Sequence, residues 1–284
     1  MPRYPVSRRT PASANLANIL LLLLLTQSAH PSESSAAGTE TLIGLVGRDY
    51  VLLAASTSSS SSGIAYTSSD LDKIYVLSDP RRDDAYGDVV VAAAAAGCPA
   101  DADRILGAAG GRCTLVEYGG DIGRDVRVVF DGRVRGGTDG AVVPASVLGP
   151  DEVGHMIRGA VADGLRKAGG KQLKVAMLVG GMGYGTGEVN GDGDRGSDTS
   201  VLRPRLLWID EYGSLLPVRY GAHGHGSNFL LSTLDARYRP DMDRQEAVGL
   251  LRDCFRQLGE RYVINSPRPP CIKCVDSSGC ELIV

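Results

Sequence analysis

Thr39 is the residue whose type and setting point most directly to chemistry. It follows Gly38 and leads into the apolar run TLIGLVG. An N-terminal threonine hydrolase would cut its own chain at such a Gly-Thr junction. The threonine hydroxyl would then attack a peptide carbonyl, while a lysine and the freed amine move protons and backbone N–H groups hold the oxyanion. The competing interpretation is structural, because β-branched threonine also favours the start of a strand.

Two patterns of cysteine and histidine could bind a metal. Cys271, Cys274 and Cys280 offer three thiolates to zinc, but no second CxxC motif or spaced histidine pair completes a tetrahedral set. His223 and His225 would share one face of a strand, yet in this Gly-rich turn two satisfied or exposed histidines are favoured. We therefore expect no metal and no cofactor.

The segment from Met182 to Ser200 is rich in Gly and Asp and has no apolar periodicity. Its NGDGDRGSD stretch departs from a calcium-binding EF-hand loop, because the turn glycine is displaced and the closing glutamate is missing. Its GMGYGTG stretch is not GxGxxG, and no helix follows to present N–H groups to a phosphate. The segment is therefore predicted to be a solvated loop inserted between two strands.

Length and composition suit one globular domain of generous size or two small ones. The chain has 284 residues, of which 43% are hydrophobic, and a formal net charge of -3. With Lys+Arg 30 against Asp+Glu 33, no basic stripe stands out, so a nucleic-acid partner is not expected. The cysteines would suffice for three disulfides, but a chain this long needs none, so free thiols are expected. They lie at positions 98, 113, 254, 271, 274 and 280.

Residues 1–38 form an N-terminal extension that differs from the rest of the chain. MPRYPVSRR, then LANILLLLLL, then small residues follow the order of a secretory signal. The apolar run is too short to span a membrane, and no membrane attachment is expected. A cleaved propeptide and an incorrectly assigned start are the alternatives.

The remaining residues, 39–284, alternate between strand and helix patterns. Apolar runs bounded by turn residues predict strands at 41–47, 49–55, 63–66, 73–79, 88–97, 173–181, 205–213, 215–224 and 271–284. The first two would form a hairpin, the next two a second pair, and the last range a hairpin by itself. Helical spacing predicts helices at 99–110, 149–170 and 243–261. This order fits two stacked sheets flanked by helices.

Several of these blocks together resemble a proteasome beta-type subunit. They agree with that family in order and spacing from about Thr39 to the C-terminus. The blocks are TLIGLVGRDYVLLAAS, LDKIYVLSD, AAAAGCPADADRI and LLWIDEYGSLLPVRYGAHGHGSNFLLSTLDARYRPDMDRQEAVGLLRDCFRQLGERYVIN. DYVLLA, AHGHGS and RYVIN are most similar to the beta subunit at the fourth ring position, named type-4 or type-2. Members of that kind are regarded as non-catalytic.

The resemblance implies an α+β fold, a four-layer αββα sandwich of the N-terminal nucleophile hydrolase type. It implies partners as well: other beta-type and alpha-type subunits in stacked seven-membered rings, and assembly chaperones. The implied role is ATP-dependent, ubiquitin-linked protein degradation in the cytoplasm and nucleus. Residues 1–38 would then be a propeptide or an incorrect start rather than a secretory signal.

The resemblance also assigns the site residues of a threonine hydrolase. Thr39 would be the nucleophile, Lys73 matches the catalytic lysine, and Gly97 matches the glycine whose N–H faces the oxyanion. The acid that orients the lysine is missing after the second strand, where the chain runs AASTSSSSSG. Val263 stands where active members carry Asp, which leaves only Ser266 of the supporting pair.

These gaps predict that Lys73 lacks its charge partner and that Thr39, Lys73 and Gly97 are relics. The chain would then be a structural subunit. Two other readings stay open: an active threonine endopeptidase in which Ser56, Asp70 or Asp72 replaces the acid, and a secreted domain. Each residue also has a structural explanation, with Lys73 as a solvated lysine paired with Asp70 or Asp72, and Gly97 as the residue of a tight turn.

Overall fold

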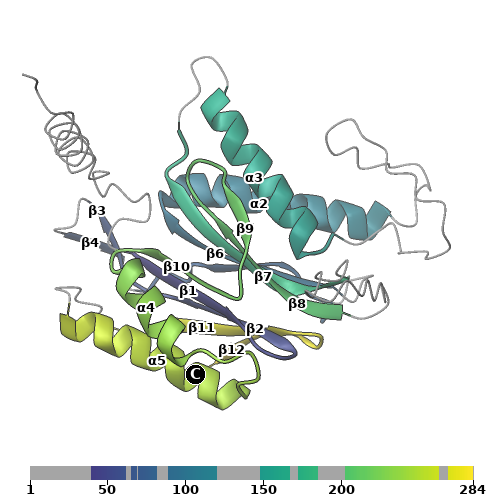
Figure 1. Ribbon diagram of the computed structural model, residues 1–284. Coiled ribbons are helices and arrows are strands. Elements are labelled where there is room, and N and C mark those ends of the chain that lie inside the picture. The colour runs from purple at the N-terminus through teal and green to yellow at the C-terminus, as the bar shows by residue number, and fades with distance from the viewer. Residues whose placement is uncertain are drawn as a thin grey trace, which may run out of the picture. The chain divides into compact units, whose positions relative to one another are not determined.

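Two antiparallel five-stranded sheets lie face to face between two pairs of helices in the computed structural model (Figure 1). The structure describes residues 40–61, 65–68, 70–81, 89–119, 148–166, 172–184, 202–261 and 268–283. All of these residues belong to one unit, Ala36–Val284.

The first sheet has the strand order β10-β1-β2-β11-β12. Its strands are β1 (Thr41–Val46), β2 (Tyr50–Ala55), β10 (Tyr220–Gly224), β11 (Cys271–Asp276) and β12 (Gly279–Ile283). The predicted hairpins are confirmed: β1 pairs with β2, and β11 pairs with β12. Leu42 lies opposite both Ala55 and His223, so β1 is an interior strand of this sheet with a partner on each side.

The second sheet has the strand order β5-β6-β7-β8-β9. Its strands are β5 (Ile74–Ser78), β6 (Val90–Gly97), β7 (Val175–Tyr184), β8 (Leu202–Ile209) and β9 (Leu215–Pro217). The predicted loop begins too early, because Met182, Gly183 and Tyr184 continue β7 and pair with β8. The rest of that predicted loop lies outside the described residues.

Two of the predicted strand arrangements are wrong. The strand predicted at 63–66 does not pair with 73–79: β4 (Ala65–Ser68) pairs with β3 (Ser59–Ser61), and β5 pairs with β6. The range 215–224 is two strands in different sheets. The chain crosses between the sheets there, because the Val218 N–H donates to Leu206 of the second sheet while the Arg219 carbonyl accepts from Val46 of the first.

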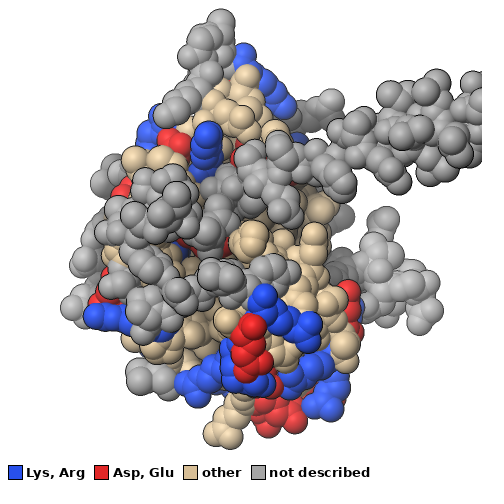
Figure 2. Space-filling model, turned by 90° about the vertical axis from the view of Figure 1, so that its left-hand side faces the viewer, with Lys and Arg blue, Asp and Glu red and all other residues tan. Residues whose placement is uncertain are grey.

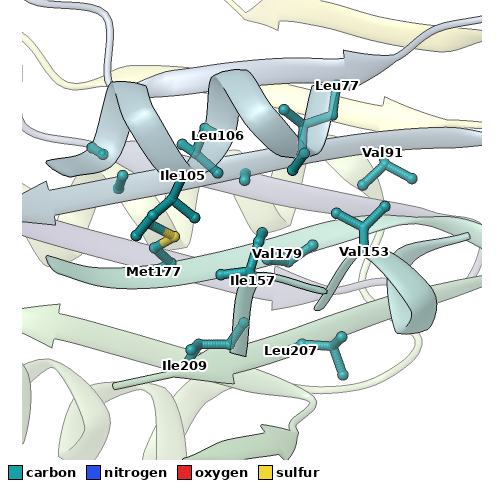
Figure 3. Close-up of a cluster of buried hydrophobic side chains, with 14 of the residues drawn as sticks. Leu77, Val91, Ile105, Leu106, Val153, Ile157, Met177, Val179, Leu207 and Ile209 are labelled. Atoms are coloured by element: carbon teal, nitrogen blue, oxygen red, sulfur yellow. The ribbon is translucent and has the colours of Figure 1, made fainter. Parts of the chain in front are cut away.

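Helices α2 (Pro99–Gly119) and α3 (Pro150–Arg166) cover the outer face of the second sheet. Figure 3 shows the cluster between them, in which Ile105, Leu106 and Ile157 of the helices face Val91 and Met177 of the strands. Because helix and strand side chains interdigitate here, they exclude water from the space between the two helices and the second sheet. Helix α2 extends beyond its predicted end at residue 110.

Helices α4 (Ser227–Arg237) and α5 (Arg244–Arg261) cover the outer face of the first sheet. The predicted helix at 243–261 is confirmed as α5. The sequence analysis missed α4, which follows Gly226 without a side-chain cap and buries only Leu230 and Leu234. Its apolar face is too narrow to produce a clear helical pattern.

A third apolar cluster fills the space between the sheets, with Leu42 and Leu53 of the first sheet and Ala94 and Leu178 of the second. The order of layers is therefore helices, sheet, sheet, helices. The predicted α+β, four-layer αββα sandwich is confirmed.

Charged side chains of both signs are interspersed on the face drawn in Figure 2. Ion pairs of this mixed kind join Arg256 to Asp253 and Glu260, and Arg237 to Asp253. A mixed surface creates no one-signed field to steer a polyanion on this face. Among the described residues, no helix combines the length and the apolar character needed to cross a membrane.

Candidate functional site

Lys73 is the centre of the candidate site. Lys73 as a whole residue is only 3% exposed to solvent. Its Nζ lies 3.2 Å from Oε1 of Glu40 and 3.3 Å from Oγ of Ser56, and it also donates to the carbonyl oxygen of Ser58. An ammonium group has three protons to donate, so these three acceptors use all of them.

Glu40 joins the lysine to the start of the βα connection between β6 and α2. One carboxylate oxygen, Oε1, contacts Lys73, while the other, Oε2, accepts a hydrogen bond of 2.9 Å from the backbone N–H of Gly97. The Glu40 residue is 5% exposed. A buried carboxylate is stable only when charge and hydrogen bonds satisfy it, and here Lys73 and Gly97 do so.

Neighbouring strands hold these groups in place. Lys73 precedes β5, and its carbonyl accepts from the Ala95 N–H of β6 at 3.0 Å. Ser56, just after β2, accepts from the Thr41 N–H through its hydroxyl at 3.1 Å and donates its own N–H to the Thr41 carbonyl at 2.9 Å. The site is therefore fixed by the ends of strands from both sheets.

Two glycines with left-handed backbone conformations frame the carboxylate. Gly97 ends β6 with φ 122, a value that residues with side chains rarely adopt. Gly224 of β10, with φ 96, lies against the Glu40 backbone, and a Cβ atom there would stand 1.7 Å from the Glu40 carbonyl oxygen. Glycine at 224 thus allows the close approach that seats Glu40.

Burial lowers the pKa of Lys73 below its ordinary value, because a charged amine loses hydration in this site. The Glu40 carboxylate opposes that effect through its charge and its hydrogen bond. The arrangement resembles a buried acid–base pair, since a lysine, a carboxylate and a backbone N–H donor converge within hydrogen-bonding distance. These are groups that acyl-transfer chemistry uses.

Comparison with known proteins shows what the chain that carries this arrangement is similar to. Residues 196–268 match the family model described as proteasome subunit. Proteasome subunit beta type-2 of Oryza sativa subsp. japonica is 28% identical over 242 residues, which cover 85% of this chain and 88% of that protein. The chain is a homologue of the proteasome beta-type subunits.

Two further proteasome beta-type relatives support this assignment. Proteasome subunit beta type-2-A of Arabidopsis thaliana is 29% identical over 242 residues, covering 85% of this chain and 92% of that protein. Proteasome subunit beta type-4 of Saccharomyces cerevisiae is 30% identical over 136 residues, covering 48% of this chain and 60% of that protein. The resemblance to beta types 2 and 4 stated from the sequence is confirmed.

The structure corrects the predicted environment of Lys73. Lys73 is neither solvated nor paired with Asp70 or Asp72, because Asp72 pairs with Lys273 at 2.6 Å and Asp70 pairs with Arg268. The expectation that Lys73 lacks a charge partner is also wrong, since Glu40 supplies it. Of the residues suggested as replacements for the missing acid, only Ser56 reaches the lysine.

Glu40 is the residue of this site that was not predicted from the sequence. The signal was present in the alternation of β1, because Leu42 faces the apolar layer between the sheets and residue 40 falls on the same face. A glutamate on an inward face needs a buried partner. Thr39, Val263 and Ser266 lie outside the described residues, so their predicted places stay predictions.

The two histidines behave as predicted for satisfied and exposed side chains. His223 is 6% exposed, stacks on Trp208 with ring centroids 4.6 Å apart, and donates from Nε2 to the Met177 carbonyl at 3.1 Å. Burial lowers its pKa to about 4. His225 is exposed.

The cysteines near the C-terminus are protonated thiols in this environment. Burial raises the pKa of Cys271 and Cys280 to about 11 and that of Cys274 to about 12. The prediction of free thiols is confirmed at all six positions. Within the described segments, no cluster of three or more His, Cys, Asp or Glu side chains could hold a metal ion.

Proposed function

We propose that this chain is a non-catalytic structural beta subunit of the proteasome core particle. Its homology to proteasome beta-type subunits supports a place in that particle. The observation that carries the non-catalytic assignment is the position of Glu40. Its carboxylate contacts both the Lys73 amine and the Gly97 N–H. A threonine hydrolase needs both groups free for the reaction with its substrate.

A carboxylate at this position opposes the reaction for an electrostatic reason. The resemblance assigns to the Gly97 N–H the task of holding the negative oxygen that develops when the carbonyl is attacked. Oxyanion donors work only when they are free and aimed at that oxygen. Here the donor is already bonded to a negative oxygen of Glu40, which would also repel the new charge.

The remaining parts of the proposal follow from membership of such a particle. The chain would sit in a seven-membered ring with other beta-type subunits, contact alpha-type subunits, and pass through assembly chaperones. It would work in the cytoplasm and nucleus and contribute to ubiquitin-linked degradation by completing the ring. No nucleic acid, membrane or cofactor enters this role.

One observation favours a second candidate, an active threonine endopeptidase. The loss of the acid was the main sequence argument against activity, yet Glu40 places a carboxylate 3.2 Å from Lys73. If Glu40 moved away from Gly97 when substrate bound, it could orient the lysine. Labelling of Thr39 distinguishes the two candidates.

Replacing Thr39 with alanine is expected to leave every peptidase activity of the assembled particle unchanged. Nucleophile, lysine and oxyanion donor work together, so a site that lacks a free oxyanion donor has no activity to lose. Removing its threonine should therefore change nothing. The measurement is hydrolysis of fluorogenic peptides by particles purified through a tag on this chain, with a threonine-directed covalent inhibitor added to a parallel sample.

Mass spectrometry of that sample supplies the control. The particle's active subunits should carry the inhibitor while this chain does not. A free Thr39 amine together with an inhibitor adduct on Thr39 would establish the endopeptidase instead. The intact mass of the chain reports in the same experiment whether residues 1–38 are removed.

Membership of the particle is tested by native co-purification. The full chain, tagged and purified from its own cells, should bring alpha-type and beta-type proteasome subunits with it. Expressed without them, it should be poorly soluble, because ring subunits leave apolar contact surfaces uncovered. A well-behaved monomer that brings no such subunits would contradict the structural role.

A further inference from the structure

A second site lies at the opposite end of β1 from Glu40. A cavity with a volume of about 860 Å³ is bounded by the turn between β1 and β2, the start of β8 and the segment between β9 and β10. Val46, the last residue of β1, lines it. Because a strand rises about 3.3 Å per residue, the cavity lies about 20 Å from Glu40. Glu40, Lys73 and Gly97 do not line it.

Basic side chains dominate the charge of this arginine-lined cavity. Arg48, Arg203, Arg205 and Arg219 line it, and Asp49 is the acidic lining residue. Within the described segments, Arg48, Arg203 and Arg219 form no ion pair. Even with Asp49 in the lining and Asp151 paired with Arg205, the four guanidinium groups leave an excess of positive charge, which raises the local concentration of anionic ligands.

Arg205 forms an ion pair but keeps one donor without a hydrogen bond. Its Nε lies 3.4 Å from Oδ2 of Asp151, yet that buried Nε makes no hydrogen bond. The contact is therefore electrostatic, and it leaves a buried donor without an acceptor. An unsatisfied buried donor is costly, so Arg205 is incompletely satisfied in the chain by itself.

We propose that the arginine-lined cavity binds an acidic peptide segment of a neighbouring chain. The inference rests on the proposed function, because a core-particle subunit has neighbouring chains. Guanidinium groups match carboxylates in geometry and bind them through two parallel hydrogen bonds. The apolar side chains of Val46, Leu206 and Val218 line the same cavity and would contact apolar side chains of the segment.

The lining also indicates how the segment is held. Pro204 and Pro217 lie in the strands that line the cavity and have no amide hydrogen to donate. Addition of a further strand is therefore disfavoured, and recognition falls to side chains. The apolar wall and Asp49 favour a ligand whose charges are separated by apolar side chains over a continuous phosphate backbone.

The first test measures peptide binding by the full chain produced without its partners as a fusion to a solubility tag, because the chain alone is expected to be poorly soluble. The probe is a fluorescent peptide of alternating glutamate and leucine, and its counterpart carries glutamine in place of glutamate. The acidic peptide should bind and the counterpart should not. The double change Arg48→Glu and Arg203→Glu should weaken binding at least about tenfold, the size expected from losing a charge-assisted contact.

Two variants control for folding and for general charge. The change of Arg48 and Arg203 to Gln removes the positive charges without reversing them and should weaken binding in the same direction. Arg112→Glu alters an exposed arginine of α2 that lies outside the cavity, and binding should be unchanged. Equal binding by all variants, or by both peptides, would overturn the inference. So would binding of inorganic polyphosphate through the same arginines without binding of the acidic peptide.

The second test uses the complex purified from its own cells, with a photoreactive residue in place of Ser277, which lines the cavity. The cross-linked segment should come from a neighbouring subunit and carry several acidic residues, and the Arg48→Glu, Arg203→Glu variant should lose it. Cross-linking to a neutral or basic segment would overturn the inference. So would cross-linking to residues 185–200 of this same chain, which include several acidic residues. Co-purifying subunits without the acidic cross-link would refute only this inference, whereas absence of proteasome subunits would refute the proposed function.

Discussion

Replacing Lys73 with methionine is expected to destabilise the folded chain by about 3–5 kcal/mol, the cost of breaking one side of a buried ion pair. The side chains of Lys73 and Glu40 are only 3% and 7% exposed, so water cannot compensate the carboxylate that is left behind. Glu40→Gln should have a comparable effect, because it leaves the lysine without its charge partner. The measurement is the free energy of unfolding in urea, followed by pulse proteolysis of the full chain.

The double variant, Glu40→Gln with Lys73→Met, should recover most of this loss, because removing both charges removes the desolvation penalty as well. Lys273→Met is the matched control. Its amine pairs with Asp72 and also donates to the Ile74 carbonyl, and the side chains of Lys273 and Asp72 are 13% and 55% exposed. Because water reaches Asp72, the loss should be smaller than at Lys73 and nearer to the value of about 1 kcal/mol for an exposed pair. If Lys73→Met destabilised the chain no more than Lys273→Met, the buried pair would not be a stabilising element of this site.

The folded chain should also lose about 3 kcal/mol of stability as the pH falls from about 6.5 to about 4, because His223 must remain neutral while folded. Its ordinary pKa of 6.5 applies to the unfolded chain, whereas burial lowers the folded value to about 4. Between these values the unfolded chain binds more protons. The stabilisation is therefore complete above about pH 6.5 and is lost as the pH falls toward about 4.

Thermal unfolding between pH 7.5 and pH 5 measures this effect. His223→Phe keeps a ring beside Trp208 but cannot titrate, so its stability should change less over this range than that of the unaltered chain. His225→Gln alters the exposed histidine and should retain the original pH dependence. Parallel curves for the unaltered chain and His223→Phe would contradict the assignment. Asp79, Asp253 and Asp276 have lowered pKa values, so their stabilisation is lost below pH 3.8, outside this window.

Elements with a strong local pattern could be predicted from the sequence. The hairpin of β1 and β2 was predicted because two apolar runs flank a Gly-Arg turn, and α5 because its apolar residues recur at helical spacing. Helix α4 was missed because it buries only Leu230 and Leu234 and has no side-chain cap. The pairing of β4 was predicted wrongly because the residue pattern of one strand does not specify its partner. The partner is decided by the turns that join the strands and by the side chains they bury together.

The sequence by itself determined the order of two stacked sheets flanked by helices, the resemblance to proteasome beta-type subunits and the presence of Lys73 and Gly97, because these depend on local periodicity and on motifs in a fixed order. Only the tertiary structure decided what those two residues do. Glu40 is 33 residues from Lys73 and 57 from Gly97 along the chain, yet its carboxylate contacts both, since β1 and β5 begin where β6 ends. Whether a buried carboxylate orients a lysine or blocks an N–H donor depends on distances of a few ångströms, and such distances arise only when the sheets come together.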